Sequence, residues 1–343
     1  MNNQKTYRST IIILLLVLIL IALFNLSFGS VNIPFKDVLY SLLGKSIEHD
    51  NWHYIIIDYR LPKTITAILV GSSLSVSGLL MQTLFRNPLA GPFVLGISSG
   101  ASLGVALLLL SAGVFGGSIA YLATANFSMA LAASLGAFLV LSAVLIAAAR
   151  VRNTMSILII GLMFGSFTGA IISILAYFSS AEQLQQFMFW SFGSLGNLSW
   201  QELLLFFTIY ILGILLIIFI IKPLNSLLLG ENYAKSMGVN FKSTRTISLI
   251  ATSLLTGVST AFSGPIAFIG LAVPHITRLL ISSSNHKTLL PSVAIIGAIV
   301  MLISDTIAQL PNSDFTLPIN AVTTLFGAPV VIWLLLRKRK LLF

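Results

Sequence analysis

The chain has 343 residues, of which 57% are hydrophobic and only 8% are charged, and its net charge is +10. Soluble domains carry about 25% charged residues, so this composition excludes a water-soluble enzyme, and the lack of cysteine excludes disulfides and thiolate metal sites. A helix needs about 20 apolar residues to cross a bilayer, and the composition therefore predicts an all-α, polytopic membrane protein.

Ten apolar segments follow one another along the chain. The first, residues 11–28, follows a short basic head, and we interpret it as a span because its apolar core is long and no small-residue cleavage site follows. The other nine spans are expected at residues 62–85, from residue 93, and at 125–149, 154–177, 202–221, 246–262, 268–281, 289–308 and 317–336. No shift in composition divides the chain, which predicts a single transmembrane domain over residues 1–343.

Three segments of higher polarity interrupt the apolar pattern. Residues 29–60 are expected as an outer loop, in which the stretch after Pro34 has the pattern of a short amphipathic helix lying on the membrane surface. Residues 180–199 are too polar to span and predict a short outer helix followed by a loop. Residues 222–245 are expected as a cytoplasmic loop with a short helix inside it.

The basic residues predict the orientation of the chain. With ten spans and a cytoplasmic start, both termini are cytoplasmic and fifteen of the nineteen Lys and Arg residues lie inside. The four expected outside are Lys36, Lys45, Arg60 and Lys63. This asymmetry follows the positive-inside rule, so the net charge reflects membrane topology and gives no indication of nucleic-acid binding.

Two patterns within the spans allow a structural and a functional interpretation. Glycines recur every fourth residue, which favours close helix packing but also suits a helix that lines a wide path. The Pro88 and Pro92 pair interrupts the apolar pattern, either as an ordinary turn or as a gate at the cytoplasmic end of a path. The two glycine series are Gly96, Gly100 and Gly104, and Gly161, Gly165 and Gly169.

The chain carries little chemistry of its own. It has no G-x-x-x-x-G-K-[ST] loop and therefore no expected ATP site, and no catalytic or metal-binding constellation. A secondary transporter would need intramembrane ionisable groups for its coupling ion, and Asp305 is the main one within a span.

Several motifs together resemble those of the FecCD/BtuC-type permeases of binding-protein-dependent ABC importers. They occur in the family's order from Arg60 to Leu336 and cover nearly the whole chain. They are RLPKT (60–64), SGLLMQTLFRNPLAGPFVLGISSGAS (77–102), GENYAKSMGV (230–239), SGPIAFIGLAVPHITRLL (263–280), HKTLLP (286–291) and LPINAVTTLFGAPVVIWLL (317–335).

The resemblance implies a BtuC-like, type II permease of about ten helices in a bacterial inner membrane. It implies a second permease subunit, most simply a homodimer, two cytoplasmic ATPases, and an extracytoplasmic substrate-binding protein. The chain itself is then no enzyme and holds no cofactor, because ATP and Mg²⁺ bind to the ATPases. The expected substrate is an iron(III)–siderophore or related iron chelate, with cobalamin or haem as the alternative.

The resemblance also assigns roles to residues. In the family, a loop like the one at 230–239 couples to the ATPase, the basic residues of RLPKT dock the binding protein, and the NPL turn contributes to a cytoplasmic gate. Three positions depart from the family pattern, namely Gln309, where Arg is frequent, and Thr316 and Asn320. The resulting candidates are Gly230, Glu231, Ala234, Met237 and Gly238 for coupling, Arg60 and Lys63 for docking, and Asn87, Leu89 and Thr154 for the gate.

Overall fold

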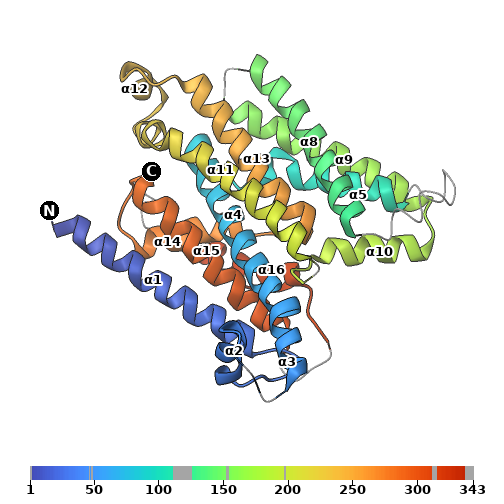
Figure 1. Ribbon diagram of the computed structural model, residues 1–343. Helices are drawn as coiled ribbons and strands as arrows, with labels where there is room; N and C mark the ends of the chain where they lie inside the picture. Colours follow the sequence, from blue (N-terminus) through green and yellow to red (C-terminus); the bar gives the residue numbers. More distant parts are fainter. Residues whose placement is uncertain are drawn as a thin grey trace. The chain divides into compact units, whose positions relative to one another are not determined.

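The computed structural model describes residues 2–45, 47, 49–110, 126–151, 154–196, 198–310 and 315–336, and these contain helices and no strand. Arg152 and the basic C-terminal run, to which the topology prediction assigned cytoplasmic positions, lie outside the described residues. The helices, which can be followed in Figure 1, are α1 (Asn2–Ser27), α2 (Phe35–Leu42), α3 (Asp50–Tyr54), η1 (Ile55–Arg60), α4 (Leu61–Phe85), η2 (Pro92–Leu95), α5 (Ile97–Leu110), α8 (Asn126–Arg150), α9 (Thr154–Tyr177), α10 (Ala181–Phe192), α11 (Trp200–Leu227), α12 (Glu231–Ser236), α13 (Phe241–Ser263), α14 (Ile269–Leu280), α15 (His286–Ala308) and α16 (Ile319–Leu336).

The helix pattern confirms the predicted fold class. In the described part of the chain, seven helices are long and apolar enough to cross a membrane, and three shorter apolar helices accompany them. Each of the ten predicted spans corresponds to one of these helices, with the shorter ones at α5, α14 and α16. Of these three, α14 lies nearly where the span at residues 268–281 was expected, whereas the described residues stop at the last residue of α5 and of α16.

Two predicted loops are more helical than expected. Residues 222–245 were expected as a cytoplasmic loop with one short helix, but α11 continues to Leu227 and α13 begins at Phe241. Residues 50–60, expected within the outer loop, form α3 and the π-helical turn η1, which continue directly into α4. The cause is tertiary packing, because Ile56 is fully buried against Leu26, Ile33 and Val38. The short amphipathic helix expected after Pro34 is present as α2.

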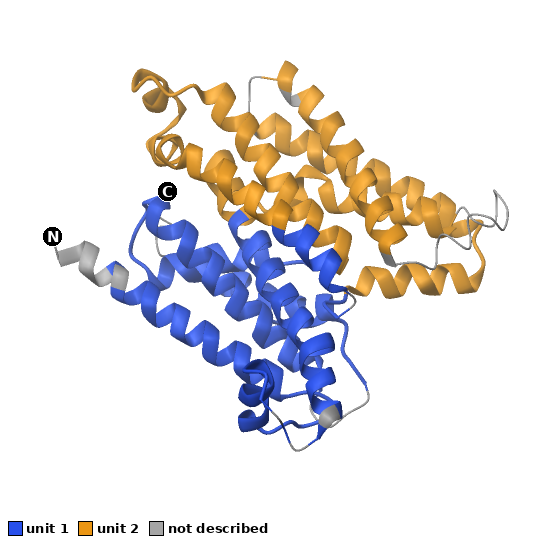
Figure 2. Cartoon of the chain, viewed as in Figure 1, with its two compact units in different colours: residues 1–76, 194–207, 266–340 blue, residues 77–193, 208–265, 341–343 orange. Residues whose placement is uncertain are grey.

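The described chain divides into two compact units, shown in different colours in Figure 2. Unit 1 comprises residues 1–76, 194–207 and 266–340, and unit 2 comprises residues 77–193, 208–265 and 341–343. Both α4 and α11 contribute residues to each unit. The single domain over residues 1–343 stays a prediction.

Within unit 1, α4 and α15 pack closely through small residues. A Cβ atom placed on Gly71 would collide with the carbonyl oxygen of Gly297, and one on Gly297 would collide with Ser75. Helices in membranes associate by such close backbone approach. This crossing brings the N-terminal half of α4 against α15, the helix that carries Asp305.

Within unit 2, glycines serve the packing of α5 against α8. A Cβ on Gly104 would collide with Ala132 of α8, and one on Gly136 would lie 2.8 Å from the backbone nitrogen of Gly104. In contrast, a Cβ on Gly169 would meet nothing within 4 Å. The packing interpretation therefore accounts for Gly104 and its neighbours, whereas a path along Gly169 stays a prediction.

A matched pair of substitutions tests this packing. We expect Gly136→Ala to destabilise the protein by about 1–3 kcal/mol, because the added methyl forces α5 and α8 apart. Gly169→Ala should leave stability unchanged or raise it slightly, since alanine favours a helix over glycine. Thermal unfolding of the detergent-purified variants measures both, and equal midpoints would contradict the packing role.

Candidate docking and coupling sites

Arg60 closes the C-terminal end of α1. Its Nη1 donates hydrogen bonds to the carbonyl oxygens of Leu26 at 2.7 Å and Ser27 at 2.9 Å, and its Nη2 donates to that of Val31. The last carbonyls of a helix lack partners within the helix, and a cation there also complements the helix dipole. The residue is only 9% exposed. The docking role of Arg60 stays a prediction, but the structure places its guanidinium mainly against the backbone.

The capping contacts of Arg60 predict a stability effect. We expect Arg60→Met to lower the free energy of unfolding by about 3 kcal/mol, at roughly 1 kcal/mol for each lost hydrogen bond. Arg150→Met is the matched control, because Arg150 is exposed at the end of α8. Thermal inactivation in detergent measures the difference, and an equal loss in both variants would refute the capping role.

Lys63, one turn further along, forms an ion pair with Asp305. The Nζ atom of Lys63 lies 3.0 Å from Oδ1 of Asp305, and the two side chains are 23% and 3% exposed. The pair joins α4 to the end of α15. A buried carboxylate requires compensation by a cation and hydrogen bonds, and this site provides both.

Two side-chain amides complete the surroundings of Asp305. Its Oδ2 accepts hydrogen bonds from Nδ2 of Asn25 at 3.0 Å and from Nε2 of Gln309 at 2.6 Å. The Asn25 side chain also donates to Thr306 at 2.9 Å and accepts from Thr64 at 2.8 Å. This network therefore connects α1, α4 and α15 within unit 1. Sequence reasoning missed it because Asn25 and Asp305 are 280 positions apart.

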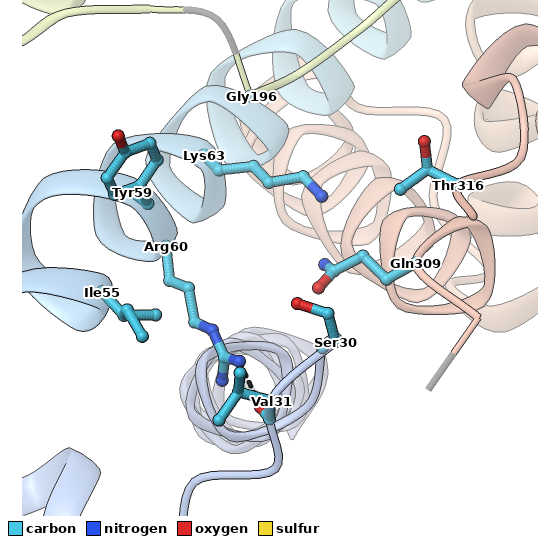
Figure 3. Close-up of a pocket in the computed structure, with 10 residues that line it drawn as sticks. Ser30, Val31, Ile55, Tyr59, Arg60, Lys63, Gly196, Gln309 and Thr316 are labelled. Carbon is cyan, nitrogen blue, oxygen red and sulfur yellow. Dashed lines mark hydrogen bonds between the residues drawn. The ribbon is translucent and has the colours of Figure 1, made fainter. Parts of the chain in front are cut away.

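A pocket of about 360 Å³ lies beside this network and is drawn in Figure 3. The Lys63 ammonium points toward Gln309 and Thr316, while the Arg60 side chain turns toward Val31. The Lys63 ammonium and the surrounding amide and hydroxyl groups suit a carboxylate, whereas the Arg60 guanidinium is occupied by backbone carbonyls. It is lined by Gly29, Ser30, Val31, Ile55, Tyr59, Arg60, Lys63, Gly196, Gln309 and Thr316.

The three departures from the family pattern have defined places in unit 1. Gln309 donates a hydrogen bond to Asp305. Both Gln309 and Thr316 line the pocket. The Oδ1 atom of Asn320 accepts a hydrogen bond from the backbone nitrogen of Ala267 at 3.1 Å. Among the described residues, no three His, Cys, Asp or Glu side chains gather as metal ligands would.

The candidate coupling residues form α12 and its two ends. Gly230 precedes the helix at φ +112° and Gly238 follows it at φ +81°, conformations that favour glycine. Ala234 is fully buried, whereas Met237 is 58% exposed. The Nζ atom of Lys235 lies 2.7 Å from Oε1 of Glu231 on the exposed side. The segment is thus a short helix bounded by glycines. Ala234 packs against the rest of the protein, and most of the other side chains are exposed.

The candidate gate turn lies in unit 2 together with α12. The Oδ1 atom of Asn87 accepts a hydrogen bond from the backbone nitrogen of Leu89 at 2.9 Å, which closes the turn, and Leu89 is exposed. Arg86 begins this turn at φ +46°, and its Nη1 lies 3.6 Å from the position that a Cβ on Gly230 would occupy. The turn and the start of α12 are therefore neighbours. Thr154 begins α9, and its side chain lies outside the described residues.

Comparisons with known proteins match almost the entire chain. The model of the FecCD transport family matches residues 14–337. The hemin transport system permease protein HmuU of Yersinia pestis is 36% identical over 342 residues, which cover 99% of each chain. The vitamin B12 import system permease protein BtuC of Klebsiella pneumoniae is 42% identical over 282 residues, or 82% of each chain. A solved inward-facing metal-chelate type ABC transporter matches with a TM-score of 0.83 and 28% identity, over 96% of this chain and 99% of that one.

Proposed function

This chain belongs to the FecCD transport family, and from that membership we propose that it is the membrane-spanning permease subunit of an ABC importer for a metal chelate. The observation that carries this proposal is the match of the family model to residues 14–337, together with relatives named as permeases that align over most of their length. The subunit resides in the inner membrane with both termini in the cytoplasm. It works by alternating access, and it is not itself an ATPase.

The substrate proposed first is an iron chelate, either a ferric siderophore or haem. Support comes from the haem permease relative, which aligns over 99% of both chains. Cobalamin is the second candidate, favoured by the higher identity of 42% to the vitamin B12 permease over a shorter alignment. Both candidates are large metal-containing molecules, so the same transport mechanism serves either.

The energy comes from two ATPase subunits that dock on the cytoplasmic side. We assign this contact to α12 and its bounding residues, because the helix is short, exposed and held by glycines at fixed backbone conformations. ATP and Mg²⁺ belong to those partners. Movement of α12 is passed to the neighbouring turn at Asn87 and Leu89, which acts as the cytoplasmic gate, with Thr154 at the start of α9.

The substrate arrives on an extracytoplasmic binding protein that docks at the pocket of unit 1. Lys63 supplies the cation for an acidic side chain of that protein, and Arg60 shapes the pocket wall while it closes α1. A second copy of the chain completes the translocation path between two permeases. The surrounding bilayer is the other partner, and no nucleic acid is involved.

Uptake measurements test the substrate class. Cells that lack their own chelate permeases would express this chain with its partner ATPase and binding protein, and would receive labelled ferric siderophore, haemin or cobalamin. We expect one of the two iron chelates to accumulate in the cells and cobalamin to stay outside. Accumulation of cobalamin alone would show that cobalamin, and not an iron chelate, is the substrate. If none of the three labelled compounds accumulates, the proposed metal-chelate substrate class is contradicted.

A further inference from the structure

The ion pair between Lys63 and Asp305 has a consequence for docking. Lys63 lines the pocket, and its ammonium is already held 3.0 Å from a carboxylate of the same chain. Any acidic side chain that enters the pocket must therefore share or take over a cation that Asp305 already neutralises. The strength of docking then depends on Asp305 as well as on Lys63.

The surroundings of Asp305 allow it to release Lys63. A buried carboxylate that loses its cation is normally very costly. Here two amide donors, from Asn25 and Gln309, both bind the Oδ2 atom, while Lys63 is paired with the other oxygen, Oδ1. Asp305 thus keeps two hydrogen bonds when the ammonium leaves Oδ1 for an acidic side chain in the pocket. The Lys63 side chain, which is 23% exposed, can make this turn more easily than the buried Asp305 can move.

We propose that Asp305 is an internal competitor that limits how tightly the pocket binds an acidic side chain of the binding protein. This inference rests on the docking role of the pocket proposed above. The competition keeps docking reversible, so that an empty binding protein can leave after it has delivered its substrate. A purely positioning role for Asp305 would have the opposite effect, since its removal would then weaken docking.

The variant Asp305→Asn separates these two roles. It keeps the shape of the side chain but removes the charge, so Lys63 loses its competitor. We expect the partner binding protein to dock about fivefold more tightly at low salt, the equivalent of about 1 kcal/mol. Surface plasmon resonance on the purified permease in nanodiscs measures this. Weaker or unchanged docking would overturn the proposal.

Glu202→Gln is the matched control for the change in net charge. Glu202 lies outside the pocket and accepts hydrogen bonds from the backbone and hydroxyl of Ser199 at 2.8 Å and 2.7 Å. Glutamine can occupy the same capping position, so the fold should tolerate the change. An equal gain in docking affinity for this variant would assign the effect to net charge and contradict a local competition.

A second variant keeps the proposal testable should Asp305→Asn fail to fold. Gln309→Arg places a guanidinium beside Asp305, where it can pair with the carboxylate and release Lys63. We expect it to fold, because Asp305 stays paired. Docking is not the readout for this variant, because the added guanidinium in the pocket attracts an acidic side chain by itself. Amine-reactive labelling of Lys63, read by mass spectrometry, should be faster in either variant than in the wild type. Slower or unchanged labelling would count against the competition whether or not docking changes.

Lys63→Gln distinguishes failure of this inference from failure of the docking site. If Lys63→Gln leaves docking unchanged, the pocket is not the docking site and the proposed function loses that contact. If Lys63→Gln weakens docking but Asp305→Asn does not strengthen it, only the competition is wrong. In the double variant the gain from Asp305→Asn should disappear, because contacting residues are coupled in such a cycle.

Discussion

Replacing Gly230 with alanine is expected to reduce chelate uptake about tenfold or more without preventing assembly of the permease in the membrane. Gly230 has φ +112° and ψ 155°, a region that is essentially limited to glycine and costs other residues about 1–3 kcal/mol. We expect a shift of α12 to relieve the strain and to separate the proposed ATPase contact from the proposed gate turn. Substrate uptake and ATP hydrolysis, both measured in proteoliposomes, should therefore become uncoupled.

Gly257→Ala is the matched control for Gly230→Ala. Gly257 lies inside α13, has an ordinary helical backbone and leaves open space where a Cβ would be added. The same chemical change there should leave uptake at the wild-type level. If Gly230→Ala also transports normally, or if both variants lose uptake equally, the coupling role of this segment is contradicted.

Lys63→Gln is expected to weaken docking of the binding protein at least tenfold, since truncating a partly buried charged contact costs more than about 1.4 kcal/mol. The glutamine amide can still donate to Asp305, but the buried carboxylate loses its cation, so we expect thermal stability to fall as well. Unchanged binding of the ATPase subunits would show that the variant still assembles and that the loss of docking is local. Surface plasmon resonance with the binding protein gives the affinity.

Lys45→Gln serves as the control for Lys63→Gln. Lys45 lies on the same side of the predicted topology, and its ammonium rests 5.5 Å from the centre of the Tyr40 ring, outside the pocket. Lys45→Gln removes the same charge as Lys63→Gln. Docking affinity should nevertheless change less than twofold, because exposed charges contribute little to binding. An equal loss in both variants would point to general electrostatic attraction in place of a specific site.

The transmembrane helices could be predicted from the sequence because each apolar run of sufficient length has few alternatives in a bilayer. The segment at residues 50–60 could not, because its polar residues Asp58 and Arg60 resemble those of a loop. Its helical form depends on Ile56, which packs against residues of α1 and α2 that are distant in sequence. Local pattern alone does not reveal such packing.

The candidate sites were predictable to different extents. The glycines around α12 were visible as a motif, and their positive φ angles give a physical reason for that residue type. The capping role of Arg60 and the network around Asp305 were not visible, because they join the end of α1 to residues up to 280 positions away. In the sequence, Gln309 is recognisable only as a neutral residue at a position where the family frequently has Arg. In the structure, its side chain donates a hydrogen bond to Asp305.

We propose that this chain moves a chelate only with energy supplied by another subunit. The most direct measurement places the permease in proteoliposomes with its partner ATPase and loaded binding protein, and follows labelled chelate with and without ATP. We predict accumulation that requires all three components and stops when ATP is withheld. Accumulation in vesicles that contain the permease alone, driven by a proton or sodium gradient, would contradict the account.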